Sequence, residues 1–122
     1  MHAGHKVRVL ARGWFVRSGV QVVKGDALDP VSVEALVGGA EAVICLLGPT
    51  PGGAPHVCAK ATKVLIAAMK EAGVERLVVQ SGAMVGHDNL GPFYRWLRQR
   101  NLEVVAERRE QERLVKESGL DW

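Results

Sequence analysis

The sequence predicts an α/β fold built on a parallel sheet, and two observations support this prediction. Four short runs rich in Val, Ile and Leu show little alternation of apolar and polar residues, which is typical of strands buried on both faces of a sheet. Segments with helical features follow the second, third and fourth runs. Strands that alternate with helices along a chain usually pair in parallel, because each helix carries the chain back across the sheet.

The strands are predicted at Val7–Ala11, Val20–Lys24, Val43–Leu47 and Leu77–Gln80. A glycine follows closely after each of these runs, as expected where a strand gives way to a turn. The chain therefore offers four strand ends at which a turn begins.

The first helix is predicted to begin at Asp29-Pro30. An Asp side chain can accept hydrogen bonds from the free N–H groups of a first turn, and Pro at the first helical position removes no donor that the helix needs. We expect this helix to run to about Val37 and to end at Gly38-Gly39.

Two further helices follow the third and fourth strands. Apolar residues recur at helical spacing at Ala61, Leu65, Ala68, Met69 and Ala72. Gly73 marks the end of that helix. The last helix is predicted over Glu103–Glu117, with opposite-charge pairs at Arg108/Glu112 and Arg113/Glu117 and a stop at Gly119.

The length and composition fit one domain over residues 1–122, with 48% hydrophobic and 24% charged residues. The net charge of +3 is compatible with an anionic ligand and too small to indicate nucleic acid. No apolar run approaches about 18 residues, and the N-terminus lacks an apolar signal segment. We therefore predict a cytoplasmic protein with no membrane partner.

The two cysteines indicate neither a metal site nor a disulfide framework, because they are only two and lack ligand spacing. Cys45 lies inside an apolar strand run, so we expect a buried, reduced thiol. Arginines late in the chain could bind an anion or nucleic acid, namely Arg95, Arg98, Arg100, Arg108 and Arg109. Glutamates lie among them, which favours a solvated helix face, so no nucleic-acid partner is expected.

In parallel sheets, ligands bind beyond the carboxyl ends of the strands. This rule selects the residues that follow each predicted strand as candidate site residues, namely Arg12, Asp26, Ala27, Leu47, Gly48 and Ser81. Arg12 can hold a phosphate through two parallel hydrogen bonds, or it can be a solvated surface residue. Asp26 can bind a ligand amino group, or it can cap the turn that leads into the first helix.

Gly48 and Ser81 also have two interpretations each. Gly48 allows a ligand to approach the backbone closely, or it merely ends the strand. Ser81 can hydrogen-bond a ligand carbonyl or amide, or it can be a turn residue.

Four segments resemble one known family and occur in that family's order. They read "GHKVRVLAR", "VVKGDALDPVSVEALVGGAEAVICLLG", "VLIAAMKEAGVERLVVQSG" and "ERLVKESGLDW". The sequence is similar to the atypical short-chain dehydrogenase/reductases, nearest to the NAD(P)H-binding, NmrA-like group that includes biliverdin reductase B (flavin reductase). The most specific parts are Gly25, Asp26 and Asp29 in the first motif and Ala72 to Ser81 in the second.

The resemblance implies a Rossmann-like three-layer fold, binding of NADP or NAD, and hydride transfer to a small organic acceptor. It also implies roles for the candidate residues. Arg12 matches the residue that faces the adenosine 2′-phosphate, which favours NADP. Asp26 and Ala27 match positions beside the adenine.

The remaining roles lie at the other end of the cofactor. Leu47 and Gly48 match residues that line the nicotinamide-side ribose. Ser81 matches a serine near the nicotinamide and the substrate, which makes it the expected catalytic residue.

The sequence also departs from this family. The usual first strand and its glycine-rich phosphate loop do not occur in these 122 residues, and we interpret the sequence as truncated at both ends. The Tyr-x-x-x-Lys pair of typical short-chain dehydrogenases is replaced by Tyr94 and Arg98, and Glu112 stands where the biliverdin reductase B branch has a histidine. We expect weak or undetectable cofactor binding and no turnover by this chain alone.

The missing first strand would lie between Val7–Ala11 and Val43–Leu47 in that fold. Its absence leaves two open strand edges, so either the halves close up or two chains associate. Of these two outcomes, we predict a homodimer. The alternative to an oxidoreductase function is a non-catalytic module that associates with itself, binds a partner or senses a dinucleotide. The aromatic candidates for its interface are Trp14, Phe15, Trp96 and Trp122.

Overall fold

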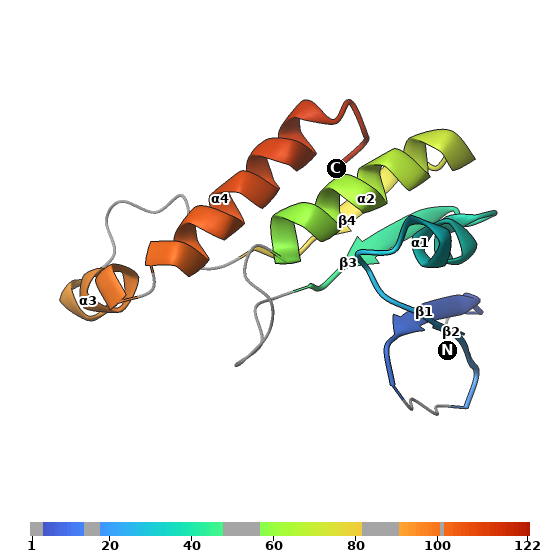
Figure 1. The fold of residues 1–122 in the computed structure, drawn as a ribbon, viewed down its shortest axis with the longest axis horizontal. Coiled ribbons are helices and arrows are strands. Elements are labelled where there is room, and N and C mark those ends of the chain that lie inside the picture. The colour runs from blue at the N-terminus through green and yellow to red at the C-terminus, as the bar shows by residue number, and fades with distance from the viewer. Residues whose placement is uncertain (1–3, 14–17, 48–56, 82–90, 101) are drawn as a thin grey trace.

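The computed structural model describes residues 4–13, 18–47, 57–81, 91–100 and 102–122. Its elements in chain order are β1 (Val7–Ala11), β2 (Val20–Lys24), α1 (Pro30–Val37), β3 (Ala42–Cys45), α2 (Val57–Ala72), β4 (Arg76–Val79), α3 (Pro92–Arg100) and α4 (Leu102–Glu117) (Figure 1). The predicted strands and helices occur in the predicted order, and α3 is a further helix that the sequence analysis did not predict. β1 and β2 have the predicted bounds. β3 begins one residue earlier and ends two residues earlier than predicted, and β4 begins and ends one residue earlier.

The described strands form two separate parallel sheets. β1 pairs with β2, and β3 pairs with β4, where Ile44 lies opposite Val78. Among the described residues β1 and β3 do not pair, so the structure does not show the closed-up sheet that was one of the two alternatives. The far side of β4 is joined to the chain end, since Leu77 N donates to Asp121 O. The edge of β3 that faces away from β4 has no strand partner in the described part of the chain.

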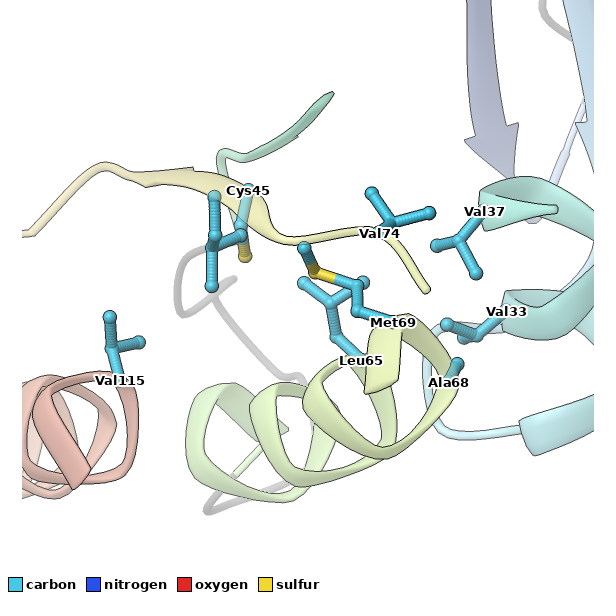
Figure 2. Packing of buried hydrophobic residues seen from close by; sticks show 9 residues of the cluster. Val33, Val37, Cys45, Leu65, Ala68, Met69, Val74 and Val115 are labelled. Atoms are coloured by element: carbon cyan, nitrogen blue, oxygen red, sulfur yellow. The ribbon is translucent and has the colours of Figure 1, made fainter. Parts of the chain in front are cut away.

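The core lies between the β3–β4 sheet and the helices α1, α2 and α4 (Figures 1 and 2). α2 packs between α1 and α4. Of its residues at the predicted helical spacing, Leu65, Ala68 and Met69 lie in this core, where Met69 is completely buried. Ala61 is also buried, whereas Ala72 is exposed. Figure 2 shows Val33 and Val37 of α1 reaching the core from one side and Val115 of α4 from the other.

The opposite face of the β3–β4 sheet is exposed. Ile44, Leu46 and Val78, which we call the outer face, are 67%, 68% and 52% exposed. Alternate residues of a strand point to opposite faces, which explains why their neighbours Cys45 and Leu77 are buried. The expectation that these strands are buried on both faces is therefore wrong for the described residues, because no described element covers the outer face.

Hydrogen bonds to side chains stabilise both ends of α1, and the one at its N-terminus was predicted. The Asp29 side chain accepts a hydrogen bond from Val31 N (3.3 Å) and another from the Ser32 hydroxyl (2.8 Å), so the predicted cap is confirmed. At the other end, the Arg8 guanidinium donates to Gly38 O (2.8 Å). A cation is favourable at a helix C-terminus, and this contact ties α1 to β1.

Gly25, at the end of β2, leaves room for Ser32 of α1. A Cβ at this position would lie 2.5 Å from Ser32 Cβ, and the Ser32 hydroxyl is already held by Asp29. We expect Gly25→Ala to lower the free energy of unfolding by about 1–3 kcal/mol, as overpacking generally does. Gly13→Ala is the matched control because nothing described lies within 4 Å of its Cβ. Urea unfolding of both variants checks this, and equal midpoints would contradict it.

Candidate functional site

A polar stripe on α4 faces the carboxyl ends of β3 and β4 and the first turns of α2. It consists of Glu107, Arg108, Gln111 and Glu112. This spacing places all four on one side of a helix. Their neighbours Glu110 and Arg113 pair with each other at the surface, as the sequence interpretation of a solvated helix face predicts.

Arg108 joins the ends of two neighbouring strands. One nitrogen of its guanidinium donates to Leu47 O (2.8 Å), to Gln80 O (3.1 Å) and to Gln111 Oε1 (3.0 Å). Arg108 and Glu112 form no ion pair in the described structure, so the pair predicted from their spacing is wrong. The carbonyl groups just past the strands are acceptors without a ladder partner, and they take the guanidinium instead.

Arg113 and Glu117 behave as their spacing predicts. An Arg113 nitrogen lies 2.7 Å from Glu117 Oε2 at the exposed end of α4. Both side chains are largely exposed, so this pair contributes little to the stability of the fold.

Ser81 is fixed by the same helix. Its half-buried hydroxyl donates to Glu112 Oε1 at 2.6 Å, a length typical of a hydroxyl bound to a carboxylate. Because the hydroxyl proton is directed at Glu112, the lone pairs of Ser81 Oγ remain able to accept a hydrogen bond. The site therefore presents an oriented acceptor at the end of β4.

Beneath this surface lies a buried polar layer. Gln111 is completely buried, and its Nε2 donates to Thr62 Oγ1 (3.2 Å). The Thr62 hydroxyl in turn donates to Cys58 O (2.6 Å). These contacts fix α4 to the first turns of α2.

Both cysteines are free and buried, as predicted for Cys45. Burial raises the pKa of the Cys45 thiol, and a backbone hydrogen bond with Leu47 and the charge of Arg108 partly oppose this shift. Burial also raises the pKa of the Cys58 thiol. A thiol with a raised pKa is a poor nucleophile, so neither cysteine is a candidate catalytic group.

The candidate residues at the ends of β1 and β2 make no hydrogen bond to the polar stripe in the described structure. Arg12 is exposed and makes no hydrogen bond or ion pair with another described residue. Asp26 Oδ1 accepts from Leu28 N (2.9 Å), so Asp26 stabilises the turn into α1. Ala27 is half-buried beside it, and Gly48 lies outside the described residues.

The structure thus brings Leu47 and Ser81 together, because Arg108 bridges the ends of their strands. The sequence interpretation missed Gln111, and it took Arg108 and Glu112 as a pair on a solvated helix face and did not place them at the strand ends. The available signal was the repeat of polar residues on one side of a helix that also carries buried Val105 and Val115.

Other types of site find little support. Within the ranges that the structure describes, no group of three or more His, Cys, Asp or Glu side chains could hold a metal ion. A hollow lined by residues such as Met69, Gly73 and Leu120 lies at the amino end of β4, away from the strand ends that Arg108 bridges. No helix in the described part of the chain is both long and apolar enough to cross a membrane.

The fold is shared with solved structures of longer proteins. A short-chain dehydrogenase/reductase from Veillonella parvula DSM 2008 matches with a TM-score of 0.70 at 18% identity, over 85% of this chain and 44% of that chain. A structure of a short-chain dehydrogenase/reductase from the same organism in complex with NADP matches with a TM-score of 0.65 at 18% identity. This match covers 85% of this chain and 45% of that chain.

A putative exported protein from Burkholderia pseudomallei matches with a TM-score of 0.68 at 23% identity, over 99% of this chain and 59% of that chain. The chain thus spans about half the length of the structures it matches. These matches confirm the predicted Rossmann-like α/β fold, and a search of curated proteins found no match. A family model described as NAD(P)H-binding matches residues 3–122, and the chain therefore belongs to this NAD(P)H-binding family.

Proposed function

We propose that this chain contributes to an oxidoreductase that binds NAD(P)H along the carboxyl ends of its strands and transfers hydride to a small organic acceptor. The observation that carries this proposal is the family match over residues 3–122. It is supported by the presence of NADP in one solved structure of the same fold. The side chains at the strand ends fit such a cofactor in type and charge.

Ser81 and Leu47 suit the nicotinamide end of the site. Ser81 Oγ, whose proton is held by Glu112, can accept a hydrogen bond from a carboxamide N–H or from a hydroxyl group of the acceptor. Arg108 holds the ends of β3 and β4 together, which fixes the position of Ser81 relative to Leu47. When bound, the reduced nicotinamide supplies the hydride, while these residues supply orientation.

Arg12 and Asp26 suit the adenosine end. The Arg12 guanidinium has no partner among the described residues, so it is available to a phosphate group at the end of β1. Asp26 uses Oδ1 for the turn. A carboxylate has a second oxygen that can accept from an amino group. This arrangement favours NADP over NAD, because only NADP carries the 2′-phosphate.

The cofactor proposal predicts a selective effect of Arg12. In a chain extended at its N-terminus by a strand and a glycine-rich phosphate loop, we expect Arg12→Ala to weaken NADPH binding by about tenfold or more and NADH binding much less, since a charged hydrogen bond is worth about 1.5–3 kcal/mol. Titrations followed by cofactor fluorescence and calorimetry measure both affinities, with the exposed Arg109→Ala as control. Equal losses would remove Arg12 from this role, and no binding of either cofactor by the extended chain would contradict the proposal itself.

A second candidate function is a non-catalytic module that associates with itself. The exposed outer face and the unpaired edge of β3 favour it, because open edges and apolar patches promote pairing between chains. Cofactor binding with turnover favours the first candidate, whereas stable association without turnover favours the second.

A further inference from the structure

α3 extends away from the rest of the molecule. Figure 1 shows it at the opposite end from β1 and β2, next to the first turns of α4. Two of its apolar side chains are well exposed, Phe93 at 64% and Trp96 at 50%, and Leu102 just after it is 63% exposed. We call Phe93, Trp96 and Leu102 the aromatic patch.

The aromatic patch has a basic component built into it. Phe93, Trp96 and Arg100 have the spacing that places them on one side of a helix. The Phe93 and Trp96 rings stack with centroids 6.2 Å apart, and the Arg100 guanidinium lies 4.7 Å from the centroid of Trp96. A guanidinium over an indole face is held there by cation–π attraction.

All charged residues of α3 are basic. Its sequence, "PFYRWLRQR", contains three arginines and no acidic residue. The glutamates that favoured a solvated helix face in the sequence lie on α4 instead, and two of them, Glu107 and Glu112, are engaged with Ala59 N and Ser81. The structure therefore separates a basic, aromatic segment from the mixed charges that follow it.

In place of the sequence expectation of no membrane partner, we propose that α3 binds the surface of an anionic phospholipid bilayer. Trp and Phe side chains on a short basic helix insert at the boundary between headgroups and acyl chains, while arginines attract the anionic headgroups. An arginine near such a surface strengthens binding by about fivefold. The position of α3 at the end of the molecule allows a flat surface to approach it without meeting the sheets.

The ring contacts favour a bilayer over nucleic acid. Single-stranded nucleic acid gains its affinity by stacking bases on open aromatic faces. Arg100 covers one face of Trp96, and Phe93 stacks beside the same ring. Insertion into a bilayer does not require an open ring face, because it depends on apolar area and charge.

Cosedimentation of the full 122-residue chain with lipid vesicles tests this proposal. We expect binding to phosphatidylcholine vesicles that contain about one third phosphatidylserine, and about tenfold or more weaker binding to pure phosphatidylcholine. Phe93→Ser/Trp96→Ser should lower the bound fraction at least about tenfold through lost apolar burial. Trp122→Ser is the matched control, because Trp122 is 62% exposed but lies outside α3.

A charge series separates the electrostatic part. Arg95→Gln/Arg100→Gln should weaken binding to anionic vesicles and reduce its sensitivity to salt, whereas Arg109→Gln on α4 should do so much less. Circular dichroism shows whether each variant keeps its fold. Equal effects of the α3 variant and the Trp122 control would overturn the proposal. So would binding to a single-stranded oligonucleotide without vesicle binding, or light scattering in which Phe93→Ser/Trp96→Ser converts a dimer into a monomer.

Discussion

Arg108→Ala is expected to lower the free energy of unfolding by about 3 kcal/mol, a large share of the stability of a small domain. The substitution removes the donor shared by Leu47 O, Gln80 O and Gln111 Oε1. Gln111 is completely buried, so water cannot replace the lost bond without opening the packing of α4 on α2. Urea unfolding followed by circular dichroism measures the change.

The neighbouring arginine provides the control. Arg109 is exposed on the same turn of α4, and replacing it with alanine should change the free energy of unfolding by no more than about 0.5 kcal/mol. Similar values for the two variants would mean that Arg108 does not hold the strand ends together. Arg108→Lys should recover part of the loss, because a single guanidinium nitrogen makes all three contacts and an ammonium also carries three donors on one nitrogen.

A second large effect concerns association, for which we propose a homodimer formed through the outer face. We expect light scattering coupled to gel filtration to give twice the mass of one chain, and Ile44→Glu to weaken the dimer by about a hundredfold or more. A charge at Ile44 would be buried against apolar side chains of the second copy. Val31→Glu is the control, because Val31 is 71% exposed on α1, away from this face.

A stable monomer at micromolar concentration, with cooperative unfolding, would contradict the homodimer. The structure also changes which residues support it. Trp14 and Phe15 lie outside the described residues, and Trp96 belongs to α3, at the opposite end from β1 and β2 (Figure 1). Trp122 stays a candidate at 62% exposure, but Ile44, Leu46 and Val78 form the apolar face beside the open edge of β3.

Local signals explain why much of the fold could be predicted. Asp29 and Pro30 start α1 through contacts within a single turn, and Gly73, with φ of 73°, ends α2 through its own backbone. Such signals involve neighbouring residues only, so the sequence carries them directly.

The candidate site depended instead on distant contacts. The carbonyl groups that Arg108 binds belong to Leu47 and Gln80, which are 61 and 28 residues away along the chain. A charged helix shows the same spacing whether its polar side meets water or strand ends, so the sequence could not distinguish these cases. Burial on both faces of β3 also depends on which other elements cover the sheet.

The division into two sheets means that one continuous hydrogen-bond ladder does not join the described strands. β1 and β2 contain no fully buried residue, and they reach the rest of the fold through α1. We therefore expect this half to unfold locally as a unit of low stability, with amide protons that exchange with solvent before those of β4 and α2. Arg12 and Asp26 belong to this half, whereas Leu47 and Ser81 belong to the other. A dinucleotide that contacts both would therefore couple their opening.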